Sequence, residues 1–245
     1  YFNLFAGGMN SFLEKSGMTG PIPILHLALP LGISFYTFQS IGYLIDVYRE
    51  KFEPERNPAK YALFVSFFPQ LIQGPISFYD QLAHQLYAER NFSYKNLKHG
   101  TLLMLWGYFK KMVIADRAVS LIQMVAPDYM QYNGTVIFIT VLVYALQLYA
   151  DFSGGIDISR GFAEILGIEM AENFCRPYFA VSINDYWRRW HITLGAWMKN
   201  YVFYSLAMSK RFFKMGKNLK QKYGDHAVGA HIAKVLPAGI ASFIT

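Results

Sequence analysis

The side chains best suited to chemistry are gathered between residues 182 and 197. This segment holds three tryptophans, two adjacent arginines and one histidine in an otherwise apolar sequence. An imidazole such as that of His191, placed beside aromatic rings and fixed cations, can titrate near neutral pH and move protons. A structural interpretation stays open, because tryptophans at helical spacing often form a core or a bilayer-interface belt, and paired arginines often anchor a helix.

A helix is the element expected to hold these side chains. Ser182, followed three residues later by Asp185, predicts the start of a helix. Asp185 is then spaced to meet Arg188 or Arg189 on the helix surface. One apolar stripe at steps of three and four predicts that the helix continues unbroken, through Trp187, Trp190, Leu194, Trp197 and Tyr201.

A second candidate site follows the apolar run 135–149, where Asp151-Phe-Ser-Gly-Gly-Ile-Asp157 brings two carboxylates and Ser153 together. Carboxylates at membrane depth are costly unless they face water or a partner. The segment could equally be a glycine-terminated helix end with solvated aspartates.

The composition favours a membrane protein. The chain of 245 residues is 53% hydrophobic and 18% aromatic, and only 16% of its residues are charged, against about a quarter in soluble domains. Its formal net charge of +7 suits cytoplasmic lysines and arginines. No nucleic-acid partner is expected, since neither an aromatic–basic RNA signature nor zinc-ligand spacing occurs. The single cysteine, Cys175, excludes an internal disulfide framework and is expected to be buried.

Several apolar runs predict helices in or on a bilayer. Run 26–48 is long enough to span roughly 30 Å of hydrocarbon. Run 61–79 is broken at Pro69 and at Gln73-Gly-Pro75, where the glutamine either lines a cavity or ends a helix. Run 101–115 contains two lysines and predicts either a short span or an in-plane helix.

The ends of the chain indicate a piece of a larger protein. Residues 1–24 read as a lead-in containing glycine and proline, and residues 227–245 as an apolar run without a flank. We expect residues 1–245 to be one membrane-embedded unit, incomplete at both ends. Between them, 210–226 is predicted to be a basic cytoplasmic loop, because 210–222 carries six basic residues and no acidic one.

Six motifs, in this order, resemble those of the membrane-bound O-acyltransferases, most closely the bacterial alginate O-acetyltransferase branch. They are Leu29-Pro-Leu-Gly-Ile-Ser-Phe-Tyr-Thr-Phe38, Tyr43-Leu-Ile-Asp-Val-Tyr-Arg49, Gln73-Gly-Pro75, Asp151-Phe-Ser-Gly154, Glu172-Asn-Phe174 and Asp185-Tyr-Trp-Arg-Arg-Trp-His-Ile-Thr-Leu194. The resemblance covers roughly residues 22–209, and the block ending in His191 is its most specific part.

The resemblance implies an all-α, polytopic membrane protein: a ring of tilted and broken transmembrane helices around a funnel, in the inner membrane of a bacterium. It implies acetyl transfer from a cytoplasmic thioester, acetyl-CoA or a phosphopantetheine carrier, to hydroxyls of an extracytoplasmic polysaccharide. Membrane lipids and an extracytoplasmic acetyltransferase partner are expected, and a metal or a permanently bound cofactor is not.

The same resemblance implies roles for particular residues. His191 matches the first of two family histidines and is the catalytic candidate. The second, in a Trp-His-Gly motif, has no counterpart here, so residues 1–245 alone are expected to be inactive. The substrate-binding candidates are Gln73, Asp151, Ser153, Asn184, Trp187, Arg188, Arg189 and Trp190, with the two arginines meeting either phosphates of the donor or lipid head groups. Gly155 departs from the family pattern, which often has tyrosine there.

Three alternatives remain open. The first is D-alanyl transfer to teichoic acid from a carrier protein. The second is a transporter with broken helices around a midplane site, although no internal pseudo-symmetry is evident. The third is a non-catalytic membrane scaffold.

Overall fold

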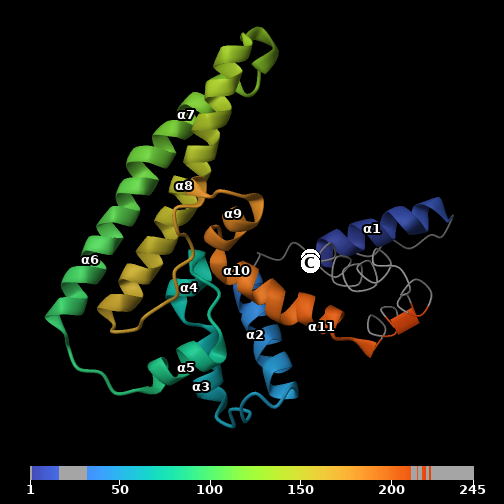
Figure 1. Ribbon diagram of the computed structural model, residues 1–245, viewed down its shortest axis with the longest axis vertical. Helices are drawn as coiled ribbons and strands as arrows, with labels where there is room; N and C mark the ends of the chain where they lie inside the picture. Colours follow the sequence, from blue (N-terminus) through green and yellow to red (C-terminus); the bar gives the residue numbers. More distant parts are fainter. Residues whose placement is uncertain (1, 17–31, 211–213, 215–216, 219–220, 222–245) are drawn as a thin grey trace. The chain divides into compact units, whose positions relative to one another are not determined.

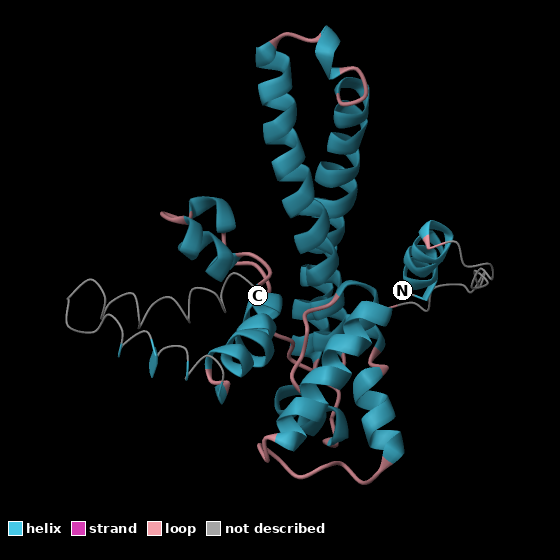
Figure 2. Cartoon of the chain, turned by 90° about the vertical axis from the view of Figure 1, so that its right-hand side faces the viewer, coloured by secondary structure: helices cyan, strands magenta, loops and turns pink. Residues whose placement is uncertain are grey.

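The computed structural model describes residues 2–16, 32–210, 214, 217, 218 and 221. The chain divides into two units, 1–33 and 34–245. In the first unit, α1 (Phe2–Lys15) occupies most of the region expected to be a lead-in. Helices dominate the described residues (Figure 2). The one β-type contact among these residues is an isolated bridge between Phe174 and Trp190. The all-α prediction is confirmed for this part of the chain.

The second unit begins with a series of short helices. They are α2 (Ile33–Tyr48), α3 (Pro58–Val65), α4 (Phe68–Gln73) and α5 (Tyr79–Tyr87). Asn57 caps α3 by accepting a hydrogen bond from the amide of Ala59. The predicted breaks in run 61–79 are confirmed, because α3 ends at Val65 and α4 ends directly before Gly74. Of run 26–48, residues 26–31 lie outside the described residues.

Two long antiparallel helical arms come next (Figure 1). The first arm consists of α6 (Tyr94–Tyr108), the π-helix η1 (Phe109–Ala115) and α7 (Asp116–Val125). After the short η2 (Tyr129–Gln131), the second arm is α8 (Gly134–Ile165), which Asn133 caps. Run 101–115 is therefore part of a longer helical arm, rather than a short separate element. Among the described helices, only α8 is long and apolar enough to cross a membrane.

Glycines let the two arms approach closely. A Cβ added to Gly161 of α8 would lie 2.5 Å from the carbonyl oxygen of Gly100, and one added to Gly154 would lie 2.9 Å from that of Gly107. Real Cβ atoms do not come this close to backbone oxygens, so larger residues would force the helices apart. These contacts therefore set the spacing between α8 and α6.

The last described part returns to α2. It contains η3 (Pro177–Phe179), α9 (Ile183–Arg189), α10 (Ile192–Trp197), the π-helix η4 (Met198–Phe203) and α11 (Tyr204–Ala207). Trp197 Nε1 donates a hydrogen bond to the carbonyl oxygen of Phe38 at 3.0 Å, and the Tyr201 hydroxyl donates to Asp46 Oδ2 at 2.7 Å. Both aromatic side chains are buried. Most of the predicted basic loop 210–226 lies outside the described residues.

Candidate active site

His191 lies at a break between two helices. The predicted continuous helix through 182–201 is wrong: α9 ends at Arg189, α10 begins at Ile192, and His191 between them has φ 46° and ψ 53°. This left-handed conformation costs of order 1–3 kcal/mol for a non-glycine residue and is maintained only when surrounding contacts require it. A histidine held in this way is a candidate for function.

The contacts that break the helix come from residues 173–175. The amide of Cys175 donates to the carbonyl oxygen of Arg189 at 2.9 Å, and the amide of Ile192 donates to that of Asn173 at 3.0 Å. These backbone groups therefore pair with a distant segment instead of continuing the helical ladder. Helical spacing in the sequence gave no sign of this competing partner.

Asn173 fixes the orientation of the imidazole. Its Oδ1 accepts hydrogen bonds from the backbone amide and the hydroxyl of Thr193, both at 2.9 Å, and lies 3.2 Å from His191 Nδ1. The bond from the Thr193 amide identifies the accepting atom as the oxygen. Nδ1 must then carry the proton, which leaves the lone pair on Nε2, and no described hydrogen bond engages that atom.

Aromatic rings surround this histidine. The ring of Phe152 meets the imidazole edge to face at 4.8 Å, and Phe174 packs against Trp190 at 5.0 Å. His191 lies outside α8, the one described helix that is long and apolar enough to cross a membrane, and burial lowers its pKa to about 4. The imidazole is therefore neutral at physiological pH, the state that a general base requires.

An apolar cavity of about 600 Å³ opens beside His191. Trp187, Trp190, Leu194, Met198 and Phe203 form its walls together with the histidine, and Lys199 supplies a cation. Its volume falls within the ~300–1,000 Å³ of typical small-molecule sites. An acyl group with part of a thioester arm would fit such a space.

The remaining candidates in this segment lie nearer to solvent. The predicted helix start at Ser182 is confirmed, since Ser182 Oγ caps α9 by accepting a hydrogen bond from the amide of Asp185. Asp185 pairs with Arg189 at 2.9 Å, whereas Arg188 is exposed and has no ion-pair partner among the described residues. Asn184 is also exposed. Arg188 is thus the arginine available to an external anion.

Asp151 and Ser153 are not at a helix end. Both lie within α8, which continues to Ile165, so the interpretation as a glycine-terminated helix end is wrong. Asp151 forms an ion pair with Lys111, and Ser153 accepts a hydrogen bond from Lys110 at 3.0 Å. Neither residue lines the cavity beside His191.

Gln73 lies where its loop meets α8. Its carbonyl oxygen accepts a hydrogen bond from Ser159 Oγ at 3.3 Å, and its side chain fills the space above Gly155, where an added Cβ would lie 2.1 Å from Gln73 Oε1. The absence of a larger residue at 155 therefore makes room for Gln73. The same loop reaches the site through Ile76, whose amide donates to Thr193 Oγ1 at 3.0 Å.

Two residues of this site were not among the predicted ones. Asn173 occurs in a motif that served only to support the family resemblance, and Thr193 follows His191 without any chemical signal of its own. Cys175, expected to be buried, is exposed. Among the described residues, no three metal-binding side chains come together.

This constellation of a strained, oriented histidine above an apolar cavity can be compared with known proteins. The profile of MBOAT, the membrane-bound O-acyltransferase family, matches residues 54–219. The chain belongs to the membrane-bound O-acyltransferase family. It is 37% identical over 206 residues to the probable alginate O-acetylase AlgI of Pseudomonas aeruginosa, an alignment that covers 84% of this chain and 39% of that protein.

The names of other relatives in this family refer to different polymers. The peptidoglycan O-acetyltransferase of Helicobacter pylori is 38% identical over 74% of this chain and 40% of its own length. The teichoic acid D-alanyltransferase of Bacillus subtilis is 29% identical over 71% of this chain and 44% of its own length. The chain thus spans about two fifths of the length of the curated relatives that it matches.

Proposed function

We propose that this chain carries the acyl-transfer site of a multi-pass O-acyltransferase in a bacterial inner membrane. The reaction would move an acetyl group from a thioester to a hydroxyl of a polysaccharide outside the cytoplasm. The observation that carries the proposal is the orientation of His191: Nδ1 is committed to Asn173, and the unengaged Nε2 belongs to a ring that lines an apolar cavity.

The chemistry requires one proton to move twice. Nε2 of His191 accepts the proton of the acceptor hydroxyl while the hydroxyl oxygen attacks the thioester carbonyl carbon. The carbon–sulfur bond then breaks, and the sulfur leaves as a thiolate that takes the proton back from the imidazolium. The products are an ester and a free thiol, and the histidine returns to its neutral state.

Two further features support a thioester donor. The walls formed by Trp187, Trp190 and Met198 suit an acyl group and the apolar part of a pantetheine arm. The unpaired guanidinium of Arg188 can meet a phosphate of coenzyme A or of a phosphopantetheine carrier. It could instead bind a lipid head group at the membrane surface.

The names of the relatives define the competing acceptors. Alginate, peptidoglycan and teichoic acid differ in charge and in the position of their hydroxyls, and D-alanyl transfer from a carrier protein is the second candidate. An extracytoplasmic acetyltransferase that completes delivery to the polymer is the partner we propose.

The test is donor-dependent transfer by the full-length protein in lipid nanodiscs. Acetyl-CoA, an acetylated carrier protein and a D-alanylated carrier protein are each supplied with glycan fragments, with and without the extracytoplasmic partner acetyltransferase, and the products are identified by mass spectrometry. We expect acetylated glycan from an acetyl thioester. D-alanylated product alone would establish the second candidate, and no product from any pair would remove the proposal.

A further inference from the structure

A second cavity, of about 280 Å³, lies between the two helical arms and the segment that carries Asn173. The described residues that line it do not include His191. Its polar lining consists of Lys110, Ser153, Asp157, Arg160, Glu172 and Asn173. A group of charges in the middle of an apolar helix pair is expensive, and such groups commonly mark a functional site.

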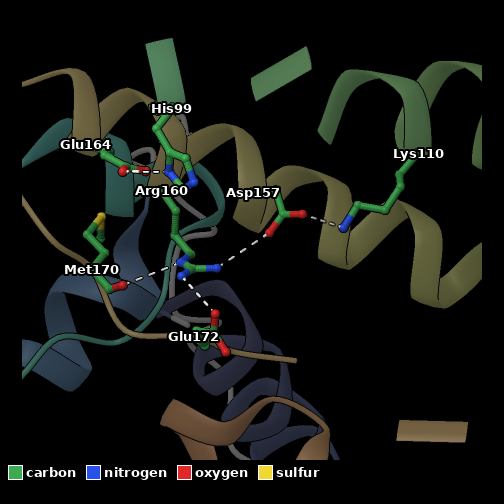
Figure 3. Close-up of polar contacts among 7 residues, drawn as sticks. All are labelled: His99, Lys110, Asp157, Arg160, Glu164, Met170 and Glu172. Atoms are coloured by element: carbon green, nitrogen blue, oxygen red, sulfur yellow. Dashed lines mark hydrogen bonds and ion pairs between the residues drawn. The ribbon is translucent and has the colours of Figure 1, made fainter. Parts of the chain in front are cut away.

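The charges in this cavity cancel one another. Asp157 lies between the two cations, 2.7 Å from Lys110 Nζ and 3.8 Å from Arg160 Nη1 (Figure 3). Arg160 also reaches Glu172 at 3.3 Å. Since two cations meet two carboxylates, a charged ligand of either sign would find no unpaired side chain of opposite charge in this cavity. The cavity instead suits an uncharged ligand that forms many hydrogen bonds.

Asn173 supplies an independent sign of a ligand. The residue is 1% exposed, its Oδ1 is occupied by Thr193 and His191, and its Nδ2 has no hydrogen-bond partner within the described structure. Buried donors are almost always paired, because an unpaired one costs about 1–3 kcal/mol. An acceptor oxygen placed in this cavity could pair with one of the two N–H groups of Nδ2, and a second oxygen with the other.

The shape of the cavity narrows the class of ligand. Its apolar lining is largely aromatic, with Trp106, Tyr149 and Phe174 beside the polar groups. A pyranose ring matches this combination, since it has an apolar C–H face and a rim of hydroxyls. The volume lies below the ~300 Å³ of the smallest drug-sized sites, which excludes the nucleotide of coenzyme A.

We infer that this cavity binds an uncharged saccharide ring of the acceptor, next to the ring whose hydroxyl reacts at His191. The inference rests on the proposed function in taking the saccharide as the acyl acceptor, but binding of a saccharide in this cavity can be tested separately. Asn173 would connect the two sites, with Oδ1 holding the base and Nδ2 holding the neighbouring sugar.

The test measures the affinity of two disaccharides for the full-length protein in lipid nanodiscs. N,N′-diacetylchitobiose is uncharged, and dimannuronate carries a carboxylate on each ring. Leu103 lines the cavity, and its neighbour Leu102 is 54% exposed on the outer side of α6. Leu103→Trp should fill the cavity, and Leu102→Trp is its matched control.

We expect the wild type and Leu102→Trp to bind N,N′-diacetylchitobiose more tightly than dimannuronate. Leu103→Trp should weaken the binding of N,N′-diacetylchitobiose by about tenfold, equivalent to about 1.4 kcal/mol, while a pantetheine probe binds unchanged. Equal affinities in all three proteins would overturn the inference. So would displacement of the disaccharide by pantetheine, or tighter binding of dimannuronate by the wild type.

A second variant tests the charge argument without filling the cavity. The side chain of Glu172 is 67% exposed, so Glu172→Gln should fold normally and leave Arg160 under-neutralised. Its preference should shift toward dimannuronate, whereas Glu164→Gln, outside the cavity, should leave the preference unchanged. An unchanged preference in Glu172→Gln would contradict the inference. Saccharide binding that depends on Leu103, in a protein without transferase activity, would retain the site and remove the proposed function.

Discussion

Asn173 and Thr193, twenty residues apart, meet at a single oxygen: the amide and the hydroxyl of Thr193 both donate to Asn173 Oδ1 at 2.9 Å. The same oxygen faces His191 Nδ1. Because Thr193 follows the histidine closely, this contact fixes the turn and the ring together. It explains how a residue with a strained backbone can present one ring nitrogen in a constant direction.

The first prediction concerns the acidic limb of the pH–rate profile. The pKa of His191 is lowered to about 4 by burial, so the wild-type rate should fall only as the pH falls toward this value. Asn173→Asp retains an oxygen acceptor but adds a negative charge beside the imidazole, which raises its pKa. The acidic limb should therefore move to higher pH.

The measurement is kcat for acetyl transfer by the full-length protein between about pH 4 and pH 8. Asn57→Asp is the matched control, because aspartate caps a helix as well as asparagine does and Asn57 lies at the start of α3. An acidic limb that stays in place in Asn173→Asp would show that His191 is not the group that titrates.

The second prediction is a loss of turnover in His191→Ala. Removal of a general base lowers rates by about 10² to 10⁴. Membrane insertion and yield should persist, because alanine is smaller than histidine and adds no volume at this buried position. His84→Ala is the control, since His84 is exposed on α5 and its ring contacts the backbone carbonyl oxygen of Asp80. Wild-type kcat in purified His191→Ala would reduce the histidine to a packing role.

The third prediction concerns the contact between the helical arms. Gly161→Ala places a Cβ 2.5 Å from the carbonyl oxygen of Gly100, so the arms must separate. Overpacking of this kind costs about 1–3 kcal/mol. Gly134→Ala, at the start of α8, meets nothing within 4 Å and should leave stability unchanged or slightly higher. Thermal unfolding in detergent compares the two, and equal Tm values would show that the close approach is not needed.

The sequence predicted local structural features better than breaks that depend on distant parts of the chain. The cap at Ser182, the pair formed by Asp185 and the breaks around Pro69 all depend on neighbours in the chain, and all three are found. The break at His191 depends on hydrogen bonds to residues 173–175. Local spacing contains no information about such a distant partner, so a continuous helix was the expected and incorrect result.

The same distinction explains the second candidate segment. Two glycines after an apolar run resemble a helix end, because glycine commonly terminates helices. In α8, Gly154 is instead required by its close contact with Gly107 of α6, and Gly155 by the side chain of Gln73. The lysines that neutralise the two aspartates lie some forty residues earlier in the chain, and only the packing of the arms brings them together.

The fourth prediction separates a buried ion pair from a neutral hydrogen bond at the same lysine. Lys110 contacts both Asp157 and Ser153, and its side chain is 9% exposed. Asp157→Asn leaves a buried cation without its counter-charge, which costs about 3–5 kcal/mol. Ser153→Ala removes only a neutral acceptor, which costs about 0.5–1.5 kcal/mol. Asp157→Asn should therefore lower Tm much more than Ser153→Ala.

A double variant provides the control for that comparison. Lys110→Gln combined with Asp157→Asn removes both charges at once, and it should recover most of the stability lost in Asp157→Asn. If the double variant is as unstable as the single one, the loss comes from packing and not from an unpaired charge.

The last prediction is that α8 crosses the membrane. Its 32 residues extend about 48 Å at about 1.5 Å per residue, more than the roughly 30 Å of hydrocarbon. Gln131 and Glu169 lie just beyond its two ends, so cysteines at these positions should react with a membrane-impermeant thiol reagent from opposite sides. Cys175 is exposed and must first be replaced by serine, since it would react itself.

In intact cells one of Gln131→Cys and Glu169→Cys should be labelled and the other only after permeabilisation. Labelling of both from the same side would show that α8 lies along the membrane or returns within it. A third cysteine, in segment 210–222, tests the charge rule: it should label from the cytoplasmic side, and labelling from outside would reverse the predicted topology.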